Sequence, residues 1–181
     1  VELGGVVPNP RLSLVYQGIE LARSEGVDFI LAVGGGSVID TAKAILYFVW
    51  ERHKARGEKF EKPCFVAIPS TSGTGSEVTN FSVISAKGAK NVLIDEFIAP
   101  DVALLDSTCI RNVPKAVIAD TGMDVLVHAL EAYVSKDATD FTDALAEKTA
   151  ELIFAHLKKL YDDPANDNAR DRVQNASCIA G

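Results

Sequence analysis

A triple glycine between an apolar run and a helical pattern constrains the fold of this chain more than any other feature of its sequence. Residues 29–33 (Phe-Ile-Leu-Ala-Val) form a short apolar run, which is typical of a strand buried on both faces. Gly34-Gly35-Gly36-Ser37 follows directly, and residues 38–50 have the pattern of a helix. Backbone N–H groups converge where such a turn enters a helix, and glycines let a ligand approach closely. The arrangement indicates an α/β unit that holds a phosphate, although three glycines after a strand can also form only a tight turn.

The residues around this turn narrow the kind of nucleotide site. The pattern is neither G-x-G-x-x-G nor a Walker loop, because no Gly-Lys-Ser/Thr follows, so a kinase or ATPase is disfavoured. Ser37 can cap the helix and also offer a hydroxyl to a ligand. Asp40, three residues later, fits a capping box, and it also fits a contact to a sugar or substrate hydroxyl. Spacing alone leaves both roles of Asp40 open.

A second loop consists entirely of hydroxyl residues and glycine. Residues 64–68 indicate a buried strand, and residues 70–76 (Ser-Thr-Ser-Gly-Thr-Gly-Ser) follow it. A surface linker has this composition too. However, the loop follows the carboxyl end of a strand, which is where α/β sheets bind ligands. We therefore favour ligand binding over a linker.

The remaining patterns divide the chain into two regions. Residues 10–25 carry apolar side chains at helical spacing, and Gly26 ends that helix. Further strands are expected at residues 81–85, 91–95 and 102–105, the first two joined by a turn at Lys87-Gly88. After Pro114 the patterns are helical, at residues 123–134, 141–161 and from 168 onward. We expect a boundary near residue 112.

The first of these later helices carries a candidate metal pair. Asp124 and His128 are four residues apart and share one helix face. Their helix is apolar nearly all round, which predicts burial, and a buried carboxylate and imidazole must be hydrogen-bonded, paired or coordinated. The spacing suits two ligands of one divalent ion, and an Asp–His pair that satisfies itself is the alternative. Glu131 follows on the same stripe, and we assign no role to His53 or His156.

Composition and charge exclude several classes of partner. The net charge of −7 argues against nucleic acid or an anionic membrane, because both require a positive footprint. No apolar run approaches the roughly 18 residues of a membrane span, and no secretory signal is visible. The three cysteines form no C-x-x-C pair. We expect reduced thiols in a cytoplasmic protein.

Three segments together resemble the iron-containing alcohol dehydrogenase family. They are Gly34-Gly35-Gly36-Ser37-x-x-Asp40, residues 68–77 (Ile-Pro-Ser-Thr-Ser-Gly-Thr-Gly-Ser-Glu) and residues 122–133 (Gly-Met-Asp-Val-Leu-Val-His-Ala-Leu-Glu-Ala-Tyr). The resemblance runs from about residue 7 to residue 181, and the three motifs in one register are highly specific. Residues 140–147 and 175–181 resemble the branch that reduces small aldehydes, the propanol, butanol or ethanolamine-pathway dehydrogenases.

The resemblance implies an α/β fold of the dehydroquinate-synthase type. A partial Rossmann-type dinucleotide-binding domain would span residues 1–112, and a partial helical metal-binding domain would span residues 113–181. The implied reaction transfers a hydride between NAD or NADP and a small primary alcohol or aldehyde, with Fe²⁺, or alternatively Zn²⁺, as the metal. Asp124 and His128 match the first two of four metal ligands. With Asp40 included, the candidate cofactor-binding residues are Asn9, Gly35, Gly36, Ser37, Asp40, Thr71, Ser72, Thr74, Thr79, Phe81, Val83 and Lys90.

The departures from the family pattern suggest an incomplete enzyme. The two remaining ligands of the family are histidines that come later than Gly181, and the opening strands of the nucleotide domain are absent. We expect an internal, inactive fragment of a protein that forms a homo-oligomer when full length. The alternatives are a non-catalytic nucleotide-binding or assembly module, and a relative of the glycerol dehydrogenase or maleylacetate reductase type. Dehydroquinate synthase itself is disfavoured, because a basic cluster for a phosphorylated sugar acid is absent.

Overall fold

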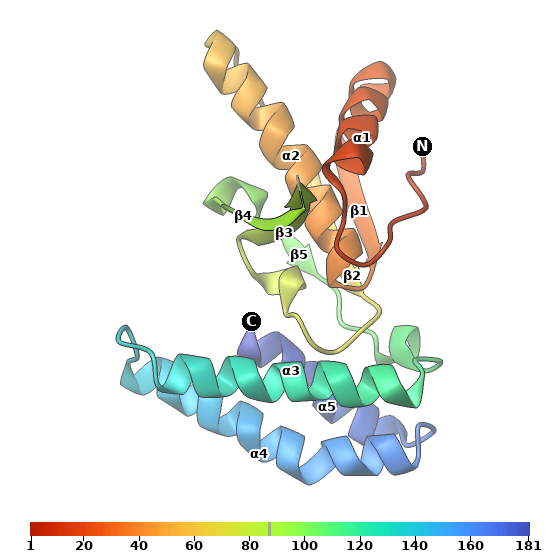
Figure 1. Ribbon diagram of the computed structural model, residues 1–181, viewed down its shortest axis with the longest axis vertical. Helices are drawn as coiled ribbons and strands as arrows, with labels where there is room; N and C mark the ends of the chain where they lie inside the picture. Colours follow the sequence, from red (N-terminus) through yellow and green to blue (C-terminus); the bar gives the residue numbers. More distant parts are fainter. Residues whose placement is uncertain (87) are drawn as a thin grey trace. The chain divides into compact units, whose positions relative to one another are not determined.

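The chain divides into two compact units in a computed structural model that describes residues 1–86 and 88–181. Unit 1 comprises Val1–Ile68 and Ser76–Leu104, and unit 2 comprises Pro69–Gly75 and Leu105–Gly181. The short segment Pro69–Gly75 therefore belongs to unit 2, although unit 1 flanks it on both sides in the sequence. Figure 1 shows the path of the chain, with the helices and strands labelled.

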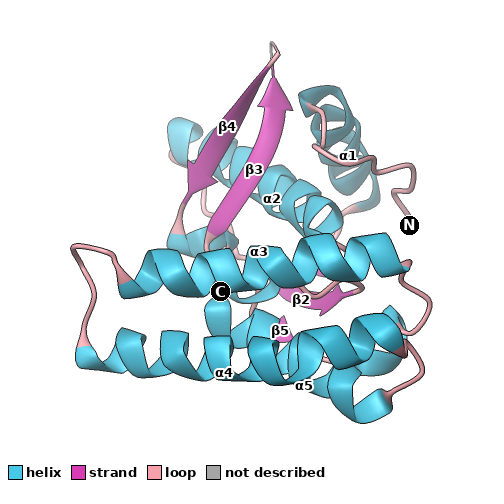
Figure 2. Cartoon of the chain, turned by 60° about the horizontal axis from the view of Figure 1, so that its bottom comes forward, coloured by secondary structure: helices cyan, strands magenta, loops and turns pink. Residues whose placement is uncertain are grey.

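Unit 1 contains all the strands that the structure describes. Its elements in chain order are α1 (Leu12–Glu25), β1 (Phe29–Gly34), α2 (Gly36–Arg56), β2 (Cys64–Pro69), η1 (Ser76–Val78), β3 (Phe81–Ala86), β4 (Ala89–Ile94), η2 (Glu96–Ile98) and β5 (Val102–Ala103). The first sheet has the order β1-β2-β5, and β2 pairs with β5 in parallel. β3 and β4 form a separate antiparallel hairpin, and β3 packs against α2 (Figure 2).

The alternation of side chains along β1 decides which of its faces is buried. Ala32 is 3% exposed and packs in an apolar cluster with Ile39 of α2 and Phe65 of β2. Leu31 and Val33, in contrast, remain 54% and 52% exposed. Successive side chains of a strand point to opposite faces, and α2 covers only one face of β1. The expectation that both faces of β1 are buried is therefore wrong.

The β3–β4 hairpin confirms the two strands expected there. Its register runs from the pair Phe81–Ile94 to the pair Ala86–Ala89. Lys87, half of the expected turn, lies outside the described residues. Gly88 has a φ of +78°, a left-handed conformation that favours glycine. β5 is shorter than expected, with two residues instead of four.

Unit 2 is helical. Its elements are η3 (Ser107–Ile110), α3 (Lys115–Tyr133), α4 (Asp140–Asp162) and α5 (Asp167–Ala180). α4 packs against both α3 and α5 (Figure 1). Apolar side chains from all three helices form one core, which includes Val125, Ile153 and Val173. Thr139 caps the amino end of α4: its hydroxyl accepts a hydrogen bond from the Thr142 N–H, and the Thr142 hydroxyl accepts one from the Thr139 N–H.

The described helices also bear on membrane insertion. None of the helices found in residues 1–86 and 88–181 is both long and apolar enough to cross a bilayer.

Candidate functional site

The glycine turn presents the amino end of α2. Gly35 is the N-cap residue, and within the described residues no side chain caps this end of the helix. Of the two roles left open for Asp40, the capping box with Ser37 is therefore wrong. Ser37 already lies inside the first turn, where its carbonyl accepts a hydrogen bond of 2.7 Å from the Thr41 hydroxyl. Because the first N–H groups of a helix lack partners within the helix, an uncapped end can bind an anion.

The side chain of Asp40 connects α2 to two other elements. Its Oδ1 accepts a hydrogen bond of 2.6 Å from Ser76 Oγ, and its Oδ2 accepts one of 3.1 Å from the Val83 N–H. Ser82 Oγ donates to the Asp40 carbonyl at 2.8 Å. Burial raises the pKa of Asp40, while the hydrogen bonds from Ser76 and Val83 and the nearby Lys43 ammonium act in the opposite direction. The carboxylate thus fixes η1 and β3 against α2, and its contact to a ligand hydroxyl stays a prediction.

Lys43 is fully buried one turn further along α2. Its Nζ donates to the Ser76 carbonyl at 2.5 Å, to Ser76 Oγ at 3.1 Å, to Thr79 Oγ1 at 3.1 Å and to the Phe81 carbonyl at 2.8 Å. Burial lowers the pKa of Lys43 to about 8, and Asp40 and Glu77 oppose this shift. Lys43 therefore holds the segment from Ser76 to Phe81 against the helix.

Glu77 is a second acidic residue close to Lys43. It is 2% exposed, and within the described residues its Oε1 has no hydrogen-bond partner. Burial raises the pKa of Glu77, and the Lys43 ammonium opposes the shift. The Lys43 ammonium thus interacts electrostatically with two carboxyl groups, the half-buried Asp40 and the buried Glu77.

The structure brings most of the sequence-predicted cofactor residues of unit 1 together. Asp40 bonds to Val83, and Lys43 connects Thr79 to Phe81. Ser85 pairs with Lys90 in the hairpin, and its N–H donates to the carbonyl of Pro10, the residue after Asn9, at 2.8 Å. Gly35, Gly36 and Ser37 form the start of α2.

Residues 70–75 of the second loop belong to unit 2, and they include the three remaining candidates Thr71, Ser72 and Thr74. Gly73 lies so close to α3 that a Cβ there would be 2.7 Å from Thr121 Cβ and 3.2 Å from its Cα. Gly75, with a φ of +61°, lies against α5, and a Cβ there would be 2.7 Å from Gly181 Cα. Both glycines are thus required by close packing. The binding roles of the three hydroxyl residues stay predictions.

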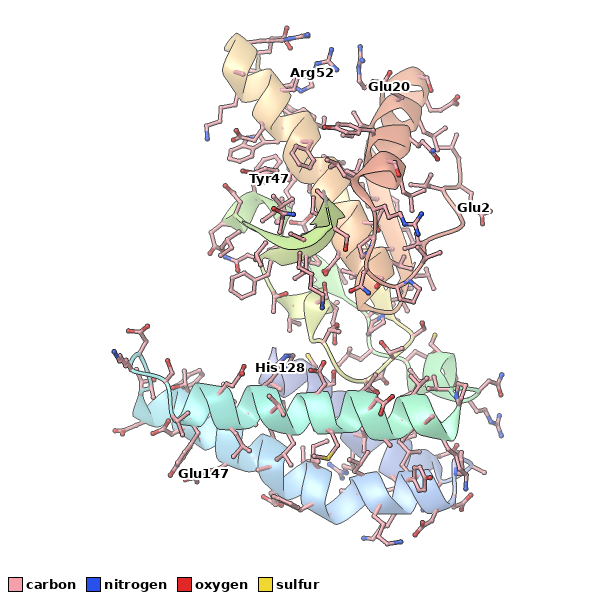
Figure 3. The ribbon with its side chains drawn as sticks, viewed as in Figure 1. Glu2, Glu20, Tyr47, Arg52, His128 and Glu147 are labelled. Carbon is pink, nitrogen blue, oxygen red and sulfur yellow. The ribbon has the colours of Figure 1, made fainter. Side chains whose placement is uncertain are left out.

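Asp124 and His128 lie on one face of α3. His128 Nε2 is 3.7 Å from Asp124 Oδ1, and the side chains of His128 and Asp124 are 33% and 45% exposed, respectively. Figure 3 labels His128 among the side chains drawn on the ribbon. The expected burial of this helix all round is wrong, because α4 and α5 cover only the face that carries residues such as Val125. Val127 and Leu130 remain 45% and 53% exposed.

The Asp124–His128 pair suits a shared divalent ion. Two donors this close can bind the same ion, and a carboxylate with an imidazole suits iron or zinc. Within the described residues, no group of three or more His, Cys, Asp or Glu side chains is arranged to hold a metal. The pair therefore supplies at most two ligands from the residues described.

Comparison with known proteins identifies the family. Residues 1–107 match the iron-containing alcohol dehydrogenase family, and residues 118–181 match the C-terminal part of the Fe-containing alcohol dehydrogenase family. The chain belongs to the iron-containing alcohol dehydrogenase family. The resemblance carried by the three sequence motifs is thereby confirmed.

Individual members of the iron-containing alcohol dehydrogenase family match nearly the whole chain. The 1-propanol dehydrogenase PduQ of Citrobacter freundii is 47% identical over 178 residues, which are 97% of this chain and 46% of the relative. The NADPH-dependent butanol dehydrogenase of Clostridium saccharobutylicum is 43% identical over 188 residues, which cover 98% of this chain and 48% of the relative. The chain thus spans about half the length of the curated relatives it matches.

A solved structure confirms the expected fold. The sulfoacetaldehyde reductase of Bifidobacterium kashiwanohense, in complex with NAD⁺, superposes with a TM-score of 0.89 at 33% identity. The match covers 98% of this chain and 50% of that one. The fold is therefore that of the iron-containing alcohol dehydrogenases, an α/β part with a parallel sheet followed by helices.

Lys43 lies outside the three sequence motifs and is not among the candidate residues named from them. A signal was nevertheless present, because Lys43 lies four residues after Ile39 and three before Leu46, on the apolar stripe of α2. A lysine on such a stripe is buried only when oxygens receive its ammonium. The oxygens come from the loop 33 or more residues later, so the sequence did not reveal them.

Proposed function

We propose that this chain contributes part of the cofactor-binding α/β domain (residues 1–112) and part of the metal-binding helical domain (residues 113–181) of an NAD(P)-dependent alcohol dehydrogenase. The reaction transfers a hydride between the nicotinamide cofactor and a small primary alcohol or aldehyde. The observation that carries the proposal is the Asp124–His128 pair, at 3.7 Å on one face of α3, in a chain 47% identical to a 1-propanol dehydrogenase.

The start of α2 is the part that would bind the cofactor pyrophosphate. Gly35, Gly36 and Ser37 present backbone N–H groups at an uncapped helix end, where the helix dipole favours negative charge. The segment from Thr79 to Val83, fixed by Asp40 and Lys43, would line the rest of the cofactor site. One relative is named as NADPH-dependent, and one similar structure holds NAD⁺, so the proposal covers both cofactors.

Asp124 and His128 would hold the catalytic metal, Fe²⁺ or Zn²⁺. A divalent ion bound there acts as a Lewis acid toward the oxygen of the alcohol or aldehyde. The two side chains fit that role because they carry one oxygen and one nitrogen donor on adjacent turns of the same helix. The Asp124 carboxylate also neutralises part of the charge of the ion, which lets the pair bind it on a partly exposed surface.

The metal assignment can be tested by calorimetric titration of the chain with Zn²⁺ or Co²⁺. We expect D124A and H128A each to weaken binding at least tenfold relative to the unsubstituted chain. D120A is the matched control, because Asp120 is an exposed carboxylate one turn before Asp124 on the same helix, and its binding should be unchanged. Equal binding by all four proteins would contradict the metal role of the pair.

A further inference from the structure

The ammonium of Lys43 determines in which direction the neighbouring hydroxyl groups of Ser76 and Thr79 donate their hydrogen bonds. A lysine ammonium has three N–H donors and no acceptor. Each oxygen that it contacts must therefore use a lone pair, and this includes Thr79 Oγ1 at 3.1 Å and Ser76 Oγ at 3.1 Å. The hydroxyl hydrogens of both residues have to point elsewhere.

Ser76 and Thr79 differ in where that hydrogen goes. Ser76 donates its hydrogen to Asp40 Oδ1 at 2.6 Å, so its hydroxyl joins the ammonium to the carboxylate inside unit 1. Thr79 is only partly buried, and its hydroxyl hydrogen cannot be donated back to the ammonium. Thr79 is therefore held as a donor at the edge of the network.

We infer that Lys43 is a positioning residue that orients the Thr79 hydroxyl to donate a hydrogen bond to an acceptor oxygen of the bound nicotinamide cofactor. This inference rests on the proposed function. Lys43 itself, fully buried behind Ser76 and Thr79, does not touch the cofactor. It acts through Thr79, and through the Phe81 carbonyl that it holds at 2.8 Å.

The charge of Lys43 maintains this orientation. The charged groups that face it are Asp40 from α2 and Glu77 from η1, and β3 contributes the Phe81 carbonyl. When the ammonium loses a proton, the neutral amine gains a lone pair that competes for the Thr79 hydrogen. Because burial lowers the pKa of Lys43 to about 8, NADH should bind more weakly as the pH rises through that region.

The test is the dissociation constant of NADH for the 181-residue chain, followed by nicotinamide fluorescence between pH 6.5 and 9.5. In the unsubstituted chain, we expect the constant to rise with pH. T79V should raise it about fivefold to tenfold at pH 6.5, the typical worth of one hydrogen bond, and should remove the pH dependence. T79S keeps the hydroxyl and should restore both the affinity and the profile.

Lys43 is tested directly with K43M, which keeps the length of the side chain but removes the ammonium. At pH 6.5, K43M should raise the dissociation constant of NADH as much as T79V does, or more. The double variant K43M/T79V should raise it by less than the product of the two single-variant factors. K62M is the matched control, because Lys62 also bonds two oxygens of unit 1, those of Ala99 and Asp101, at 2.7 Å each, and neither residue belongs to the Lys43 network. It should leave NADH binding unchanged.

Each outcome bears on a different statement. If T79V retains the affinity and pH profile of the unsubstituted chain, the inference is overturned while the proposed function stands. The same holds if a folded K43M binds NADH normally. If K43M does not fold, the T79V and T79S profiles still decide the question. If the unsubstituted chain binds neither NADH nor NADPH, the proposed function fails, and the inference fails with it.

Discussion

Replacing Gly75 with alanine tests whether the second loop is packed into unit 2 as the structure shows. Gly75 has a φ of +61°, which costs an L-residue about 1–2 kcal/mol. A Cβ at this position would also lie 2.7 Å from Gly181 Cα and 3.3 Å from the Ser177 carbonyl. These are backbone atoms, so no side-chain rotation relieves the contact, and overpacking of this kind costs about 1–3 kcal/mol. G75A should therefore destabilise the chain by about 2–5 kcal/mol.

Gly57 provides the matched control for the conformational part of this cost. It has a φ of +67° at the end of α2, and a Cβ there would meet no atom within 4 Å. G57A should therefore lose only about 1–2 kcal/mol. The difference between the free energies of unfolding lost by G75A and by G57A isolates the cost of the close approach of the loop to α5.

The assay is urea unfolding followed by far-UV circular dichroism, which reports on the helices of both units. G75A should shift the midpoint to lower urea by clearly more than G57A does, with little change in the slope. Equal shifts would refute the packing argument, because the positive φ of each glycine would then account for the whole loss of stability. The loop would then be open around Gly75, and its glycines would have no packing role.

Two further predictions concern stability in each unit. Burial acts to raise the pKa of Asp101, but hydrogen bonds from Lys62 and the Phe65 N–H outweigh it and hold that pKa below its ordinary value. The stability that Asp101 contributes is thus fully present above about pH 4 and is lost as the pH falls through the lower folded pKa. D101N should therefore destabilise the chain at pH 7 in thermal unfolding, and its difference from the unsubstituted chain should shrink as the pH is lowered below about 4. In α4, I153A should cost about 2–5 kcal/mol in urea unfolding because Ile153 is 2% exposed, whereas F154A, at a side chain 76% exposed, should cost about 0.5 kcal/mol or less. Similar losses for I153A and F154A would contradict the packing of α4.

The elements that were predictable from the sequence are those with local signals. The apolar run before Gly34 and the helical pattern after it fix β1 and α2, and the turn glycine Gly88 separates two strands that pair as expected. The three motifs also identified the family, because their spacing and order are rarely shared by chance. Local patterns suffice where neighbouring residues make the contacts.

Burial and capping were less predictable, because they depend on what other elements cover. The apolar residues Val33 and Val127 look equivalent in sequence to the buried Ala32 and Val125, but no described element packs on their faces. Asp40 appeared suited to cap its own helix, yet its oxygens bond to Ser76 and Val83, more than thirty residues away. Long-range partners of this kind also explain why the buried charge of Lys43 was missed.

The most direct test of the proposed redox function is propanal reduction by a chimera. The chain would replace the corresponding half of the Citrobacter freundii 1-propanol dehydrogenase, to which it is 47% identical. With Fe²⁺ present, we predict propanal-dependent oxidation of NADH or NADPH that is lost in the D124A chimera and retained in D120A. A chimera that is folded and binds the cofactor but does not reduce propanal would contradict the account, and so would a fully active D124A chimera.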